Sequence, residues 1–194
     1  MTFSIDRRAF VAGTSSLLLT SGSAIAGAAV PAARFPIRLH EMPVLDARSR
    51  RRGLLIRDFM RDRVTVLNFM FTGCSTICPM QAALLSAAQR LLAREMDARV
   101  VFTSVSIAPL TDTPEALVRF ADAQRAGRGW HFLRGALDET QRFQEGVDSL
   151  APRVEDHPPV IAIGRAGAPR WSRLYGAPAP DLIAGEARKW LVPA

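Results

Sequence analysis

The stretch "VTVLNFMFTGCSTICPMQAALL", residues 64–85, decides how the rest of the chain can fold. It begins with a near-continuous apolar run, Val64 to Phe71, that is rich in β-branched and aromatic residues. Such a run is typical of a strand buried on both faces of a sheet. The only two cysteines of the chain, Cys74 and Cys78, follow at once, and Pro79 comes directly after the second. The sequence therefore predicts a central strand that ends at a cysteine-containing loop.

A helix is predicted to follow this loop, from Pro79 to about Met96. Proline suits the first turn of a helix, where its missing N–H group would have no partner in any case. The apolar residues that recur at helical spacing, and that we expect to face the core, are Met80, Leu84, Ala87 and Leu91. The cysteines then lie at the amino-terminal end of this helix.

Further strands and helices alternate along the rest of the chain. The expected strands are residues 99–107, 130–135, 158–164 and 168–176, and the expected helices are residues 113–124, 138–150 and 183–191. The helices are predicted to start at Thr113 and Asp138 as N-caps, with core faces formed by Leu117, Phe120 and Ala121 and by Phe143, Val147 and Leu150. The turn-rich segment 35–62 is expected to add one or two short strands.

This order predicts an α/β fold. Strands that alternate with helices favour a parallel sheet covered on both faces, and the expected hairpin of residues 158–176 adds antiparallel strands. A mixed central sheet with flanking helices in this order is that of a thioredoxin-like fold. In that fold the cysteines lie where the first core strand ends and its helix begins.

The first residues have the pattern of an export signal. Arg7 and Arg8 precede Phe10, and residues 9–33 carry no charge and end in small residues. This arrangement resembles a twin-arginine signal, with candidate cleavage sites ending at Ala26 or Ala28. We expect residues 1–33 to be removed after export or retained as a membrane anchor, and residues 34–194 to form the functional domain.

The net charge of +7 does not by itself indicate a nucleic-acid partner. The basic residues are scattered, and the densest run is Arg48 to Arg52. Aromatic residues do not interleave with this run, as a groove for single-stranded nucleic acid would need. We interpret the run as a solvated loop and expect no nucleic-acid binding.

The two cysteines admit three roles in an oxidising compartment: a structural disulfide, a redox pair or a metal clamp. The amino-terminal end of a helix favours thiolate over thiol. Helix positions four apart have Cβ atoms about 5–6 Å apart, whereas a disulfide needs about 3.8 Å. Because Cys74 precedes the helix, the loop can close this gap, but a metal ion between the sulfur atoms suits the wider spacing at least as well.

A third metal ligand is sought among the three histidines. His40 lies in the entry segment and His131 in a short strand, and both are interpreted as structural or surface residues. His157 lies in "EDHPPVIAIG", in the loop before a core strand. In a thioredoxin-like fold that loop abuts the start of the cysteine helix. Two thiolates and one imidazole suit Cu(I), and such a set can also hold Cu(II).

Four ordered motifs resemble those of the Sco (SenC-type) copper chaperones: "NFMFTGCSTICPM", "SVSIAPLTDTPEALVRFA", "GWHFLRG" and "EDHPPVIAIG". The resemblance implies a thioredoxin-like domain on the outer face of the cytoplasmic membrane. It also implies one copper ion held by Cys74, Cys78 and His157, with Asp156 beside the histidine to orient it or balance its charge. The family passes this copper to the Cu_A centre in subunit II of cytochrome c oxidase, or reduces the cysteines of that centre.

The chain departs from the family pattern at three places. Thr76 stands where many members carry an acidic residue, and Ala108 precedes Pro109 where the family usually has aspartate. Pro158 and Pro159 directly follow the histidine, and the first of them restricts the backbone of His157 to extended conformations. No predicted ligand is lost by these changes.

The leading hypothesis is a periplasmic, monomeric copper chaperone whose partner is the oxidase subunit or another copper-accepting protein. The alternative is a thiol–disulfide oxidoreductase, in which Cys74, the thiol nearer to solvent, attacks a partner disulfide and Cys78 resolves the mixed disulfide. A structural disulfide is the third interpretation, although it would close only a very short loop. Loss of His157 separates the first two hypotheses, because an oxidoreductase would tolerate it.

Overall fold

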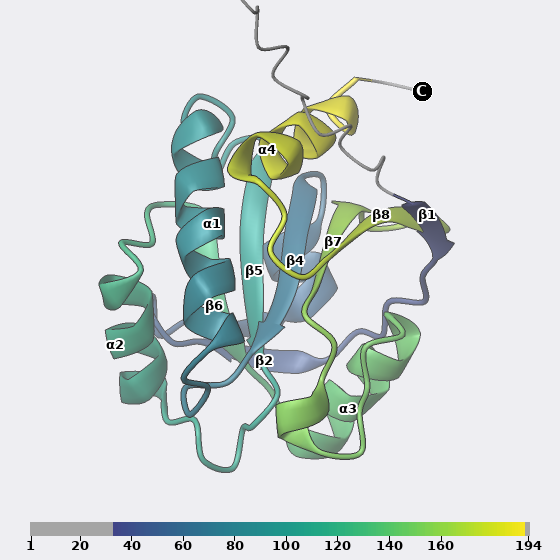
Figure 1. Cartoon of the computed structure of the whole chain (residues 1–194). Helices are drawn as coiled ribbons and strands as arrows, with labels where there is room; N and C mark the ends of the chain where they lie inside the picture. Colours follow the sequence, from purple (N-terminus) through teal and green to yellow (C-terminus); the bar gives the residue numbers. More distant parts are fainter. Residues whose placement is uncertain (1–32, 193–194) are drawn as a thin grey trace, which may run out of the picture.

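The computed structural model describes residues 33–192, which form one mixed sheet of eight strands with helices on both faces (Figure 1). The strand order is β1-β8-β7-β4-β5-β6-β2-β3. The strands are β1 (Ala33–Pro36), β2 (Pro43–Asp46), β3 (Arg52–Leu54), β4 (Val64–Met70), β5 (Val100–Ser106), β6 (Trp130–Arg134), β7 (Val160–Arg165) and β8 (Arg170–Tyr175). The α-helices are α1 (Ile77–Leu91), α2 (Pro114–Ala123), α3 (Leu137–Gly146) and α4 (Pro180–Lys189).

The three central strands β4, β5 and β6 are parallel, and the remaining strands pair antiparallel. Residue Met70 at the end of β4 pairs with Ser106 at the end of β5. The loops that follow these two strands therefore leave the sheet side by side, at the edge where the cysteine loop begins. The predicted order of strands and helices and the mixed sheet are confirmed.

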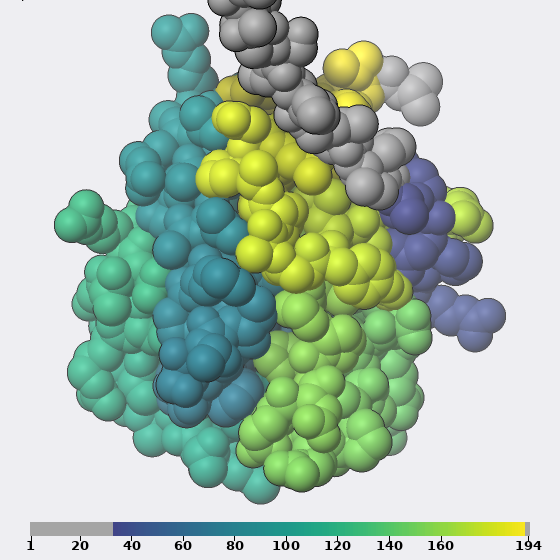
Figure 2. Space-filling view, in the orientation of Figure 1, coloured from purple at the N-terminus to yellow at the C-terminus, as the bar shows by residue number. Residues whose placement is uncertain are grey.

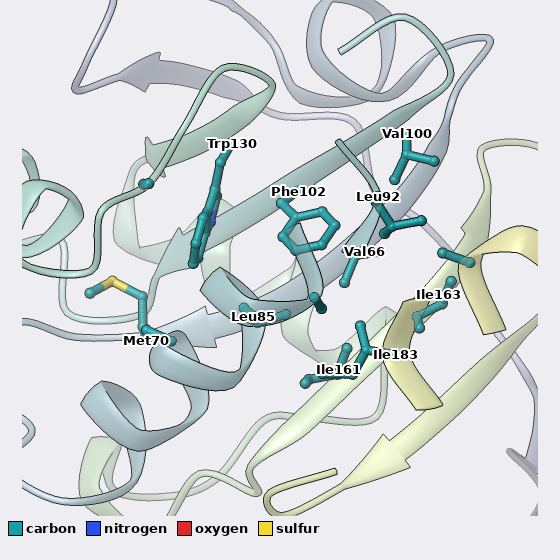
Figure 3. Close-up of a cluster of buried hydrophobic side chains, with 14 of the residues drawn as sticks. Val66, Met70, Leu85, Leu92, Val100, Phe102, Trp130, Ile161, Ile163 and Ile183 are labelled. Atoms are coloured by element: carbon teal, nitrogen blue, oxygen red, sulfur yellow. The ribbon is translucent and has the colours of Figure 1, made fainter. Parts of the chain in front are cut away.

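Helices cover each face of the sheet and enclose a separate core there. One core contains side chains from α1, α2 and α4 together with Val66 and Phe102, and Figure 3 shows part of it. The other contains side chains from α3 and from a π-helical turn, Leu55–Met60, together with Leu67 and Val105. Adjacent residues of β4 thus enter opposite cores, which explains why the whole strand is buried and mostly apolar.

The predicted core face of helix α1 is largely wrong, although Leu84 is partly buried and packs against the core. Met80 and Leu91 are 47% and 44% exposed, whereas the buried stripe is formed by Cys78, Gln81, Ala82, Leu85, Ser86, Ala88 and Gln89. Alanine and leucine occupy both stripes, so apolar content does not separate them. The buried stripe contains two glutamines whose amides have partners in the fold: Gln81 donates to the Gly176 carbonyl and Gln89 to the Arg128 carbonyl.

Several predicted helix ends also differ. Helix α1 ends at Leu91 and not near Met96, and α3 starts after Ala136, so Asp138 lies in its first turn and is not its cap. Helix α3 ends at Gly146, which leaves Leu150 41% exposed outside it. Thr113 does cap α2, since its hydroxyl oxygen accepts a hydrogen bond from the Ala116 N–H at 3.2 Å.

The entry segment is more regular than expected. It contributes the edge strand β1, which pairs with β8, and the pair β2–β3, which extends the sheet beyond β6. The predicted export signal lies, apart from Ala33, outside the described residues. Among residues 33–192, each helix is too short or too polar to cross a membrane.

Candidate functional site

The cysteine loop connects the end of β4 to the start of α1. Its first turn is closed by the Cys74 N–H, which donates to the Phe71 carbonyl at 3.3 Å. Cys74 is partly exposed in the loop, whereas Cys78 lies in the first turn of α1 and is only 3% exposed. The prediction that Cys74 is the thiol nearer to solvent is confirmed.

The two cysteines are brought together as free thiols. The backbone N–H of Cys78 donates a hydrogen bond to Sγ of Cys74 at 3.3 Å. This contact places the first sulfur atom over the amino-terminal end of α1, where unpaired N–H groups and the helix dipole favour negative charge.

The surroundings separate the acidities of the two thiols. Burial alone would raise the pKa of Cys74, but hydrogen bonds from the Cys78 thiol and from the backbone N–H groups at the helix start outweigh burial and lower this pKa below its usual value. Burial and the hydrogen bond to Cys74 raise the pKa of Cys78 to about 12. Cys74 is thus the thiol that ionises first, and Cys78 holds its proton.

His157 lies at the end of a short 3-10 turn, Val154–Asp156, and is 6% exposed. Its Nδ1 is 2.9 Å from the Val154 carbonyl oxygen, and because a carbonyl only accepts, Nδ1 must carry the proton. In the neutral ring the lone pair then lies on the other nitrogen, Nε2. A hydrogen bond of this kind fixes the tautomer that metal-binding histidines use.

The turn that carries His157 borders the cysteine site. The His157 ring meets the ring of Phe71, the residue whose carbonyl holds Cys74, edge-on at a centroid distance of 6.1 Å. On the side of α3 it lines a cavity of about 120 Å³ together with Ile107 and Leu150. Figure 2 shows the surface of the start of α1 directly beside the surface of the segment between α3 and β7. Segments far apart in the sequence therefore meet at this edge.

The predicted copper ligands are not gathered into one cluster. Among residues 33–192, no group of three or more His, Cys, Asp or Glu side chains is close enough together to hold a metal ion. The structure pairs Cys74 with Cys78, and the His157 ring lies against the Phe71 ring without joining the two thiols in a cluster. The Asp156 carboxylate is exposed and lies 3.8 Å from the Arg153 guanidinium, so the Val154 carbonyl, and not Asp156, is the partner of the His157 ring.

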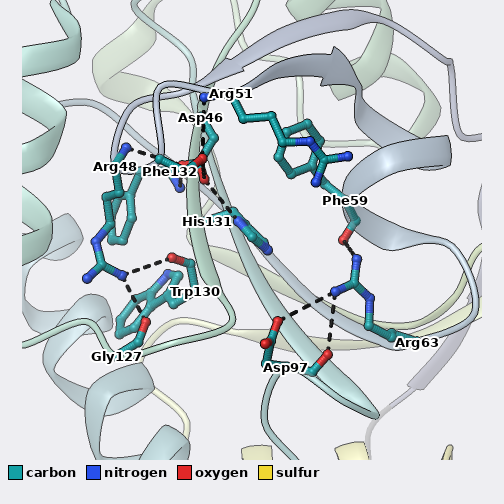
Figure 4. A network of polar contacts seen from close by, with 11 residues as sticks. Asp46, Arg48, Arg51, Phe59, Arg63, Asp97, Gly127, Trp130, His131 and Phe132 are labelled. Carbon is teal, nitrogen blue, oxygen red and sulfur yellow. Dashed lines mark hydrogen bonds and ion pairs between the residues drawn. The ribbon is translucent and has the colours of Figure 1, made fainter.

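The other two histidines are paired with carboxylates elsewhere. Nε2 of His40 lies 2.6 Å from Glu139, and Nδ1 of His131 lies 3.1 Å from the buried carboxylate of Asp46 (Figure 4). His131 also packs edge-on against Phe59, with ring centroids 5.3 Å apart. Both have the structural contacts that the sequence led us to expect.

The Arg48 to Arg52 run is largely occupied by contacts within the chain. Arg48 donates to the carbonyls of Gly127 and Trp130, at 2.8 Å and 3.3 Å (Figure 4). Arg50 forms an ion pair with Glu115 at 2.7 Å, and Arg51 lies over the Phe59 ring. These contacts tie the β2–β3 turn to the rest of the fold.

Two residues of the site were missed from the sequence. Phe71 was read only as the end of a strand, and Asp112, which contacts the loop before Cys74, was read only as part of the approach to α2. The sequence does contain a signal for Asp112. In "TDTP" this acidic residue lies directly before a helix cap and shortly after a buried strand.

The fold and the site define the class of protein. A mixed sheet with thioredoxin-like topology, two cysteines at the start of the helix after its first central strand, and a histidine before an antiparallel core strand make this a thioredoxin-like thiol protein. The family is more specific: a protein-family model for SCO1/SenC matches residues 55–159. The chain belongs to the SCO1/SenC family.

Relatives of known sequence and structure agree with this assignment. The SCO1 protein homolog of Bacillus subtilis is 35% identical over 87 residues, which cover 43% of this chain and 44% of that protein, so the match spans less than half of the relative. A SCO1/SenC family lipoprotein from Bacillus anthracis has a similar structure, with a TM-score of 0.71 and 21% identity over 84% of this chain and all of that one (100%). ScoI of Bradyrhizobium japonicum, solved with copper bound, has a TM-score of 0.64 and 15% identity over 78% of this chain and 98% of that one.

Proposed function

We propose that this protein is an exported copper-binding chaperone that delivers copper to the Cu_A centre of cytochrome c oxidase during its assembly. Family membership supports a copper or redox role in that process, because Sco proteins are cytochrome c oxidase assembly proteins and relatives have been solved with copper bound. The observation that carries the proposal for this chain is the pair of unlike thiols at the helix start, near a histidine whose Nδ1 is held by the Val154 carbonyl.

Each proposed ligand has a distinct part in holding the copper cargo. Cys74 is partly exposed and ionises readily, so its thiolate is the first contact for an arriving Cu(I) ion. Cys78 must give up its proton when the metal binds, which makes uptake release a proton. His157 supplies a ring nitrogen as third ligand after its turn moves toward the thiols, because the three side chains are not clustered among residues 33–192. Acceptor thiolates can then replace these ligands one at a time.

A second candidate function is favoured by the same thiols. Cys74 has the exposure and the lowered pKa of an attacking thiol, and Cys78 the burial of a resolving one. In this reaction the Cys74 thiolate attacks a partner disulfide and releases one partner thiolate. Cys78 loses its proton and displaces the second, so the partner is reduced and the Cys74–Cys78 pair is oxidised. This activity needs neither metal nor His157.

The cellular location is part of the proposal. The twin-arginine pattern of residues 1–33 would bring the protein to the periplasm, either free or held at the membrane. The lipoprotein relative from Bacillus anthracis supports an exported, membrane-associated protein. Copper acceptors with thiol ligands would meet the Cys74 edge of the sheet from the aqueous side.

The test is a Cu(I) titration of the reduced full chain against a chromogenic Cu(I) chelator. We expect one equivalent to bind, and His157→Ala to lower the affinity by about tenfold or more, since one of three ligands is lost. His40→Ala is the matched control, because that imidazole is paired with Glu139 away from the cysteines. An unchanged affinity in His157→Ala would favour the oxidoreductase, and absence of copper binding by the reduced wild type would refute the chaperone.

A further inference from the structure

Asp112 is a buried carboxylate beside the cysteine loop. The residue is 1% exposed, and its two oxygen atoms accept three hydrogen bonds. Oδ1 accepts from the Thr72 N–H at 2.9 Å and from the Thr72 hydroxyl at 2.6 Å, and Oδ2 accepts from the Ser106 hydroxyl at 2.6 Å. The Asp112 side chain therefore accepts a hydrogen bond from each donor of Thr72, the residue two positions before Cys74.

These hydrogen bonds join three segments. Thr72 follows β4, Ser106 is the last residue of β5, and Asp112 lies just before the Thr113 cap of α2. Thr72 is held by Asp112, and the next hydrogen bond along the chain closes the turn from Phe71 to Cys74. The position of the Cys74 backbone is thus set by the parallel strand ends through Asp112.

The segment that carries Asp112 is itself anchored. The Asp112 N–H donates to the Ala108 carbonyl at 2.8 Å, which closes the turn after β5. The guanidinium of Arg134, at the end of β6, donates twice to the Pro109 carbonyl, at 2.9 Å and 2.7 Å. The Asp112 backbone is therefore anchored by contacts that do not involve the cysteine loop.

The charge of Asp112 lacks a counter-charge from the protein. In the part of the chain that the structure describes, Asp112 takes part in none of the ion pairs. A buried carboxylate without a cation is costly unless hydrogen bonds compensate, and here all three known donors come from the two strand ends. Burial is the main cause of the raised pKa of Cys78, and repulsion from Asp112 adds to it.

We propose that Asp112 is the positioning residue of the cysteine site: its carboxylate holds Thr72 and thereby sets the place from which Cys74 reaches a metal ion or a partner sulfur. This inference rests on the proposed function for the identity of the metal. The positioning itself is a property of the thiol and can be measured without copper.

The experiment compares Asp112→Ala with Asp112→Asn in the reduced full chain. Asparagine keeps an oxygen that accepts both Thr72 donors, and its amide can donate to the Ser106 hydroxyl, so it preserves the positioning while it removes the charge. Ser106→Ala is the matched control, because it removes one hydrogen bond of the same carboxylate without touching Thr72. Two readouts are taken: Cu(I) affinity by chelator competition, and the rate of Cys74 alkylation by iodoacetamide.

We expect Asp112→Ala to lower the Cu(I) affinity by about tenfold, because removal of a group that orients a metal ligand has an effect of this size. We also expect it to change the rate of Cys74 alkylation by about threefold or more. Asp112→Asn and Ser106→Ala should stay within about threefold of the wild type in both readouts. Equal losses in Asp112→Asn and Asp112→Ala would assign the effect to charge and overturn the proposal. So would a folded Asp112→Ala variant with both readouts unchanged.

Two measurements keep the result decisive. If Asp112→Ala does not fold, Thr72→Val removes only the hydroxyl donor at 2.6 Å and should still lower the Cu(I) affinity and change the alkylation rate, whereas no change in either would overturn the proposal. If the wild type binds no Cu(I), the proposed function fails, but the alkylation rates of the variants still decide whether Asp112 positions Cys74.

Discussion

The imidazole of His157 lies edge-on to the ring of Phe71, with centroids 6.1 Å apart and ring planes at 75°. The carbonyl of the same phenylalanine accepts the hydrogen bond from the Cys74 N–H. Phe71 therefore contacts both parts of the proposed copper site. Among residues 33–192 the three proposed ligands do not form a cluster, so joint coordination by His157 and the thiols requires the turn Val154–Asp156 to move toward the cysteines.

The ring nitrogens of His157 should report that movement. We expect one equivalent of Cu(I), added to the reduced and ¹⁵N-labelled protein, to shift the Nε2 resonance of His157 while Nδ1 keeps its proton on the Val154 carbonyl. His131 and His40 serve as internal controls, since carboxylates already occupy one nitrogen of each. A His157 ring that does not respond while the thiols take up metal would contradict its role as a ligand.

The two thiols should differ strongly in reactivity. The pKa of Cys74 is lowered and that of Cys78 is raised to about 12, so Cys74 ionises at the lower pH. We expect iodoacetamide to modify Cys74 first, with a rate that rises with pH around a midpoint below that of an ordinary cysteine. Mass spectrometry after partial alkylation identifies the modified residue. Cys74→Ser should abolish the fast phase and Cys78→Ser should retain it; equal rates at both cysteines would be inconsistent with the environments described.

Gly164 is required by the packing of β7 against β8. A Cβ atom at this position would overlap the indole of Trp171, which is fully buried. We expect Gly164→Ala to lower the free energy of unfolding by about 1–3 kcal/mol, because the overpacked side chain cannot move aside. Gly185→Ala is the control: its Cβ in α4 meets no atom within 4 Å. That change should be neutral or stabilise by up to about 1 kcal/mol through helix propensity. Chemical denaturation measures both, and a Gly164→Ala variant as stable as wild type would disprove the packing argument.

Asp46 should couple stability to pH. Burial alone raises the pKa of this carboxyl, but hydrogen bonds from His131 and Ser49 outweigh burial and lower it below its usual value. The folded state therefore favours the charged form. Its stabilising contribution is fully present above the unfolded pKa of about 3.9 and is lost as pH falls through the folded pKa.

Asp46→Asn tests this coupling. We expect the variant to be less stable than wild type by about 1–3 kcal/mol at pH 7, because a charged hydrogen-bond acceptor is lost. The difference should shrink as pH falls below about 4, where the wild-type carboxylate becomes protonated. Urea denaturation between neutral and acid pH provides the measurement. A difference that stays constant to acid pH would show that the charge of Asp46 does not stabilise the fold.

The predicted export signal can be tested by locating the protein in whole cells. Replacing Arg7 and Arg8 together by lysine should leave the protein in the cytoplasm, because the receptor reads the arginine pair. Fractionation followed by immunodetection distinguishes the compartments in a host with a twin-arginine pathway. Undiminished export of the lysine variant would refute the assignment.

The order of elements could be predicted because it depends on local periodicity. The apolar run of β4 and the proline and cysteines at the start of α1 are read directly from neighbouring residues. The orientation of α1 could not be predicted in this way. Its buried stripe includes Gln81 and Gln89, whose amides have partners only because the folded chain brings the Gly176 and Arg128 carbonyls to them.

The sequence by itself determined the class of fold, the family motifs and the placing of both thiols at one helix start, since these follow from residue type and spacing along the chain. Only the tertiary structure decided that the pKa values of the two thiols move in opposite directions, that His157 packs against Phe71, and that Asp112 holds a residue 40 positions away. The physical reason is that burial, pKa and hydrogen-bond partnership are set by the segments that pack against a side chain. Those segments are distant in the sequence and are brought together only where the parallel strands end.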